Sequence, residues 1–158
     1  AGALPGDPGE PASLQPGMAG ASPASMAAPG SAASDFAIAK TMLERGDYEA
    51  AEMAFREYLR QHPKDRARAD AVFSIGESFY RRNRYREAAE QYLSVTTDHA
   101  KSGRAAEAML KLGMALRGLG AVAEACGTYA EVGRKYPNAS PAVKQAVERE
   151  RKRAQCAA

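Results

Sequence analysis

The sequence repeats a pattern of small and apolar residues three times, with a period of 37 residues. At this period, the repeating positions hold the same kind of side chain in each copy: Ile38, Ile75 and Leu112; Met42, Phe79 and Leu116; Ala51, Ala88 and Ala125; Phe55, Tyr92 and Tyr129. A unit of this length buries its apolar face only by stacking against neighbouring units. The repeat therefore restricts the fold to a stack of similar units.

Each copy holds two amphipathic helices. Apolar residues such as Val72, Ile75 and Phe79 are spaced three or four apart, which places them on one helical face. A residue that readily adopts the left-handed conformation separates the two helices of each copy: Gly46, Asn83 and Gly120. Small residues in the first helix allow the second helix to approach closely: Ala39, Gly76 and Gly113. The sequence predicts an all-α fold of three helix pairs.

The motif of each copy resembles the tetratricopeptide repeat. It contains an apolar residue followed by Gly or Ala, a large apolar residue four places on, then "GDY" or an equivalent, an alanine, an aromatic residue and a closing proline. The resemblance implies a right-handed α-solenoid with repeats at about 34–66, 67–103 and 104–139. The chain departs from the motif at Asp35, usually a large apolar residue, at Ala100, usually proline, and at Val122, usually tyrosine.

The tail after the third repeat predicts a seventh helix over 141–154, which completes a repeat domain spanning 34–158. Ser140 is a favourable N-cap, and Pro141 is favourable at the first helical position. Shifted by another period, the columns of Leu112 and Gly113 fall on charged residues, so this helix is not a fourth repeat. We expect it to cap the last repeat.

Residues 1–33 differ from the rest of the chain. They contain six of the 9 prolines, six of the 14 glycines and only two charged residues, Asp7 and Glu10. Such a segment buries too little apolar surface to offset the entropy of ordering it, so we expect a disordered linker rich in Pro, Gly, Ala and Ser. All 22 Lys and Arg residues follow it, together with 17 of the 19 acidic residues, which gives the repeat domain a formal charge of +5.

No motif for catalysis, cofactor binding or metal binding stands out. His62 and His99 share a repeat column with Tyr136 at the end of second helices, which indicates a structural role. No phosphate-binding loop or nucleophile elbow occurs. No apolar run approaches the roughly 20 residues of a membrane span. We expect a non-enzymatic protein without a cofactor, a metal site or membrane insertion.

The first helices of stacked pairs line the concave face of a solenoid, where a partner peptide would bind. Nine positions opposite the predicted helix-pair contact are candidates for this groove: Phe36, Lys40, Leu43, Phe73, Glu77, Tyr80, Leu110, Met114 and Arg117. Aromatic residues at helical spacing are also typical of a core. Burial in the core or contact with the linker or another molecule is therefore the alternative.

Longer stretches resemble one family more closely. The segments "GDYEAAEMAFREYLRQHP", "AVFSIGESFYRRNRYREAAEQYLSV" and "EACGTYAEVGRKYPNAS" are similar to the C-terminal domain of the Tol-Pal system protein family YbgF/CpoB. This resemblance implies a periplasmic coordinator of cell division, with TolA and a peptidoglycan synthase complex as partners. It also implies an N-terminal coiled coil that trimerises, although residues 1–33 contain no heptad pattern.

Two alternative functions remain open. The first is a generic tetratricopeptide scaffold of another envelope complex, such as outer-membrane protein assembly. The second is binding of nucleic acid or anionic membranes through the basic tail "KQAVERERKRAQ". That tail lacks the aromatic residues on which single-stranded nucleic acids stack. We therefore expect no nucleic-acid partner.

The two cysteines form a candidate disulfide. Cys126 lies near the start of the last second helix, and Cys156 lies near the end of the tail helix. Because these two helices are expected to run antiparallel, their sulfur atoms approach each other. An oxidising periplasm would permit the bond. The alternative is two reduced thiols.

Overall fold

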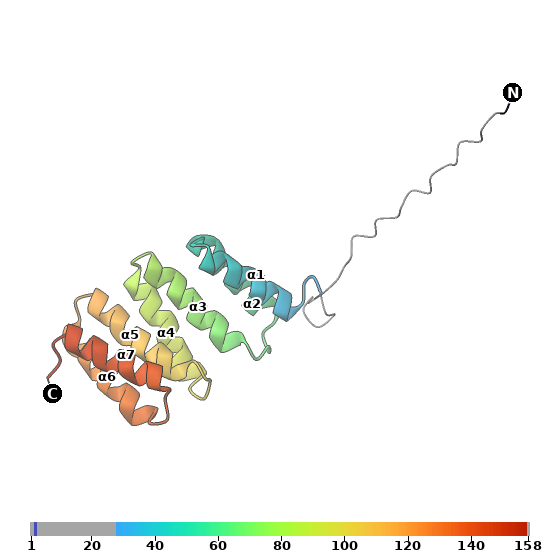
Figure 1. The fold of residues 1–158 in the computed structure, drawn as a ribbon. Coiled ribbons are helices and arrows are strands. Elements are labelled where there is room, and N and C mark those ends of the chain that lie inside the picture. Colours follow the sequence, from blue (N-terminus) through green and yellow to red (C-terminus); the bar gives the residue numbers. More distant parts are fainter. Residues whose placement is uncertain (1, 3–27, 158) are drawn as a thin grey trace.

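The fold was analysed in a computed structural model that describes Gly2 and residues 28–157. Its elements are seven helices in the described residues: α1 (Ala32–Glu44), α2 (Tyr48–Gln61), α3 (Arg68–Arg81), α4 (Tyr85–Asp98), α5 (Ala105–Gly118), α6 (Val122–Lys135) and α7 (Pro141–Arg153). Successive helices stack side by side from α1 to α7, as Figure 1 shows. The predicted all-α fold, with three helix pairs and a C-terminal helix, is confirmed.

The three turns within the helix pairs share the same backbone conformation. Gly46, Asn83 and Gly120 have φ angles of 84°, 59° and 83°, in the left-handed region. One residue later the backbone N–H reaches back to the first helix; the N–H of Arg84, for example, donates to the carbonyl of Phe79 at 2.9 Å. This is the hydrogen-bond pattern of a glycine-type helix C-cap. The predicted turn residues therefore define the ends of the first helices.

A tyrosine ring lies over the small-residue column of the second and third repeats. A Cβ atom added to Gly76 would lie 2.7 Å from Tyr92 Cε1, and one added to Gly113 would lie 2.4 Å from Tyr129 Cε1. Both distances are shorter than carbon atoms tolerate. The column is small because a tyrosine ring of the second helix packs against it.

The start of the domain differs slightly from the prediction. Helix α1 begins at Ala32, because the Ser31 hydroxyl accepts a hydrogen bond from the Ser34 N–H at 3.1 Å and so caps the helix. The last residues of the predicted linker, 32 and 33, are therefore helical. Residue 1 and residues 3–27, which hold most of that linker, lie outside the described part of the chain.

Helix α7 packs on α5 and α6 and has no second helix of its own among the described residues (Figure 1). The Ser140 hydroxyl accepts a hydrogen bond from the Val143 N–H at 3.2 Å, and Pro141 is the first helical residue. Val147, Glu150 and Ala154 are buried, and Val143 and Ala146 are partly buried. Among the helices described, none is long and apolar enough to cross a membrane.

Candidate functional site

The nine predicted groove residues fall into three repeat columns, and the first column faces the core. Phe73 and Leu110 are only 5% and 4% exposed. The Phe73 ring lies 5.6 Å from that of Tyr92, and the Phe36 ring lies 5.5 Å from that of Phe55. The prediction that Phe73 is exposed on the concave face is wrong, because this position leans toward the second helix of its own repeat.

The second column contains Lys40, Glu77 and Met114. Lys40 is exposed and lies 4.0 Å from the Glu44 carboxylate. The Glu77 carboxylate accepts a hydrogen bond from the Tyr92 hydroxyl at 2.5 Å and lies 3.4 Å from Lys111 Nζ on the next first helix. Burial, together with the Glu77 carboxylate, raises the pKa of Tyr92 far above its usual value. Glu77 thus bridges α3, α4 and α5.

The third column contains Leu43, Tyr80 and Arg117. Leu43 is partly buried against the core. Tyr80 is half-buried; its ring lies 5.3 Å from Tyr85, and Lys111 Nζ lies 5.8 Å from its centre. Tyr80 and Lys111 therefore form one polar and aromatic surface across α3 and α5.

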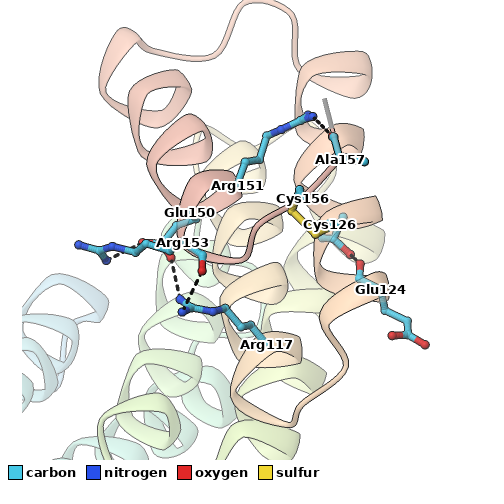
Figure 2. The surroundings of a disulfide bond; sticks show 9 residues. Arg117, Glu124, Cys126, Glu150, Arg151, Arg153, Cys156 and Ala157 are labelled. Carbon is cyan, nitrogen blue, oxygen red and sulfur yellow. Dashed lines mark hydrogen bonds and ion pairs between the residues drawn. A yellow bond between two sulfur atoms is a disulfide. The ribbon is translucent and has the colours of Figure 1, made fainter.

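Arg117 does not project freely from the concave face. Its guanidinium lies 3.6 Å from the Glu150 carboxylate of α7 and also donates to the Arg153 carbonyl at 3.4 Å (Figure 2). Glu150 is 4% exposed and pairs with Arg153 at 3.0 Å as well. A buried carboxylate requires such partners. Arg117 and Glu150 therefore fix α7 against α5.

Between α5 and α7 lies a pocket of about 340 Å³ that sequence reasoning did not find. Its apolar walls are Leu110 and Met114 from α5 and Val143 and Ala146 from α7. Leu110 and Met114 were predicted groove residues, but their contribution depends on the position of α7. The apolar pair Val143 and Ala146 on the inner face of the tail helix was the available signal. We call this cavity the α5–α7 pocket.

Charged side chains surround the α5–α7 pocket: Glu107, Lys111, Arg149 and Glu150. Glu107 pairs with Arg104 at 2.9 Å, Lys111 pairs with Glu77, and Glu150 pairs with two arginines. Arg149 makes no ion pair with the carboxylates of residues 28–157. The uncompensated charge at the pocket is therefore positive.

Tyr129 behaves differently from its repeat counterpart Tyr92. Each ring lies over a glycine of the preceding helix, but Met114 stands where the earlier repeat has Glu77. The Tyr129 hydroxyl is buried without a hydrogen-bond partner among the described residues. Burial, assisted by the charge of Glu150, raises the pKa of Tyr129 to about 12.

The predicted cysteine pair is confirmed. Cys126 of α6 and Cys156, after the end of α7, form a disulfide with a Cα–Cα distance of 5.5 Å (Figure 2). Because Cys156 lies in the segment that follows α7, the bond attaches this segment to the last repeat. Neither cysteine is fully buried.

His62 has a structural partner. His62 Nε2 lies 2.8 Å from Asp35 Oδ2, so the unusual acidic residue of α1 serves as a partner for the end of α2. Within the part of the chain that the structure describes, no three His, Cys, Asp or Glu residues are grouped as metal ligands. The contacts of the site are those of packing, ion pairing and an apolar pocket.

Antiparallel helix pairs stacked with their first helices on one face define an α-solenoid, a protein-interaction scaffold. The tetratricopeptide repeat family matches residues 36–98 and again residues 73–140. The chain therefore belongs to the tetratricopeptide repeat family.

Solved structures show the same fold. The tetratricopeptide repeat domain of Sgt2 from Aspergillus fumigatus is 18% identical, with a TM-score of 0.64 and 83% of each chain covered. The second such domain of human RPAP3, in complex with an HSP70 peptide, is 19% identical, with a TM-score of 0.59, over 75% of this chain and 92% of that one. The first repeat domain of Spaghetti (RPAP3), bound to an HSP90 peptide, is 16% identical, with a TM-score of 0.60, over 80% and 94%. No curated protein matches the sequence.

Proposed function

We propose that this protein is a non-enzymatic periplasmic interaction module whose concave face binds a segment of a protein partner. The observation that carries the proposal is the continuous surface from Tyr80 and Lys111 to the α5–α7 pocket, where apolar walls adjoin unpaired positive charge. Peptide recognition on helical scaffolds uses such apolar anchors with charged neighbours. The RPAP3 domains, which have the same fold, are in complex with peptides, and this supports peptide binding as the use of the fold.

The proposed biological role is coordination of Tol-Pal-driven outer-membrane constriction with septal peptidoglycan synthesis. The segments that resemble the YbgF/CpoB family support this role, and the disulfide between Cys126 and Cys156 is consistent with an oxidising compartment. The corresponding partners are a TolA-like component and a peptidoglycan synthase complex. In this proposal the segment before α1 serves as a linker, the helices from α1 onward form the binding module, and a coiled coil preceding the linker allows oligomerisation.

Crosslinking in intact bacterial cells, followed by mass spectrometry, tests this role. We expect TolA-like and peptidoglycan synthase peptides among the crosslinked partners, and fewer of them when Tyr80→Ala replaces the wild type. Tyr80→Ala is compared with Met53→Ala, because Met53 is 71% exposed on α2. Crosslinks only to outer-membrane assembly proteins would instead support a generic envelope scaffold. Crosslinks confined to cytoplasmic proteins would contradict the periplasmic role.

A further inference from the structure

We propose that the α5–α7 pocket is the anchor site for one large apolar side chain of the partner, and that Arg149 binds an acidic residue next to that anchor. This inference rests on the proposed function and specifies the partner chemistry: a peptide segment in which Leu, Ile, Met or Phe adjoins Asp or Glu. The tetratricopeptide motif and a concave face do not by themselves imply this anchor site, because half of the pocket is formed by α7, which lies outside the repeats.

The size and walls of the pocket select the anchor. A volume of about 340 Å³ has room for one large apolar side chain together with part of the adjoining peptide. Leu110, Met114, Val143 and Ala146 contribute only aliphatic or thioether groups to the walls. Removing an apolar side chain from water into such walls supplies the binding energy. Methionine at the wall also adapts its shape to different anchors.

The charges at the pocket determine which type of residue is favoured beside the apolar anchor in the bound peptide. Both carboxylates at the rim already have arginine partners: Glu107 pairs with Arg104, which also pairs with Asp70, and Glu150 pairs with Arg117 and Arg153. Arg149 is exposed, so its guanidinium is available for a bidentate contact with a carboxylate. A basic residue at this place in the peptide would meet an uncompensated positive charge. The charge pattern thus favours acidic over basic partners.

The pocket exists only while α7 is held against α5. The Arg117–Glu150 ion pair joins the two helices directly, and the disulfide between Cys126 and Cys156 attaches the end of α7 to α6 (Figure 2). Glu150 lies at the rim of the pocket, whereas Arg117 and the two cysteines are not among the lining residues, so these contacts position α7 and leave the apolar walls free for the anchor.

Selection from a library of random 12-residue peptides displayed on phage tests the proposal, with the full chain, disulfide intact, as the bait. We expect enriched peptides to share a large apolar residue beside Asp or Glu. Synthetic copies are then titrated by fluorescence anisotropy against Arg149→Glu and against Ala142→Trp, which places a large ring at the mouth of the pocket. Each variant is expected to weaken binding at least about 10-fold: Arg149→Glu because a charge-assisted contact is lost, and Ala142→Trp because its ring obstructs the anchor.

Two matched controls make the test specific. Lys144→Glu reverses a charge on the side of α7 that faces α6. Ala123→Trp adds a ring at an exposed position of α6. Both variants are expected to keep the peptide affinity within about twofold of the wild type. Circular dichroism checks that each variant is folded. Enriched peptides without acidic residues, or unchanged binding to Arg149→Glu and Ala142→Trp, would overturn the proposal. If those peptides lose affinity for Tyr80→Ala only, the concave face binds peptides outside the α5–α7 pocket, and the proposed function stands without this inference. If no peptide is enriched, the anchor-site inference and the proposed peptide-binding function both fail.

Discussion

Cys126 and Cys156 occupy the positions that Glu52 and Arg82 hold two repeats earlier. Arg82 at the end of α3 donates to the Glu52 carboxylate of α2 at 2.6 Å, and Cys156 after α7 bonds to Cys126 of α6. In both cases a second helix is linked to the end of the first helix of the following unit. Helix α7 therefore docks on the last repeat in the way that a first helix docks on the repeat before it, and a covalent bond replaces an ion pair at this junction.

Removal of the disulfide is expected to lower the free energy of unfolding by about 3–4 kcal/mol, because the bond closes a loop with a sequence separation of 30. Urea unfolding of the wild type with and without dithiothreitol measures the effect. The double variant Cys126→Ser with Cys156→Ser is the control and should not respond to dithiothreitol. Equal stability of the oxidised and reduced wild type would show that α7 is held by its noncovalent contacts alone.

The two buried tyrosines are expected to respond oppositely to removal of the hydroxyl. Tyr129→Phe should be neutral or stabilise by up to about 1–2 kcal/mol, because the hydroxyl is buried without a described partner. Tyr92→Phe should destabilise by about 1.5–3 kcal/mol, because it removes a hydrogen bond to the Glu77 carboxylate. Chemical denaturation of both variants checks the difference. A loss of stability in Tyr129→Phe as large as in Tyr92→Phe would mean that its hydroxyl has a partner in solution.

Gly113→Leu is expected to destabilise the domain by about 1–3 kcal/mol or more, since the Tyr129 ring leaves no room for a Cβ atom. Gly127→Leu on α6 is the matched control. Nothing lies within 4 Å of a Cβ atom there, so the higher helix propensity of leucine should stabilise by up to about 1 kcal/mol. Thermal unfolding separates the two. A folded Gly113→Leu with an unchanged midpoint would mean that α5 and α6 are not packed as described.

Glu52 is expected to stabilise the fold at neutral pH and to lose this effect in acid. Burial alone would raise the pKa of Glu52, but hydrogen bonds from Arg82 and Arg56 outweigh burial and lower it. A depressed folded-state pKa gives stability that is present above the unfolded value and disappears as pH falls below about 4. Comparison of the wild type with Glu52→Gln between pH 7 and pH 3 tests this. A stability difference that stays constant over the range would contradict it.

The sequence predicted the helices and turns because their causes are local. Spacing of apolar residues defines a helical face, and a left-handed residue such as Asn83 ends a helix wherever it occurs. Which side of a helix stays exposed, by contrast, depends on how the helices pack and not on local sequence. Phe73 is buried against Tyr92 of α4, whereas Tyr80 contacts Tyr85 at the start of α4 and stays half-exposed, and the spacing of residues within α3 does not record this difference. The α5–α7 pocket likewise depends on where α7 docks.

The disulfide also has a consequence for the order of folding. Each helix packs against the next helix or the next but one, so contacts join residues close in the sequence and folding can start in any repeat. The loop closed by Cys126 and Cys156 contains only α7 and most of α6. The disulfide between Cys126 and Cys156 can therefore form before α1 to α4 are folded. Helices α1 to α4 then pack onto a C-terminal part that is already folded.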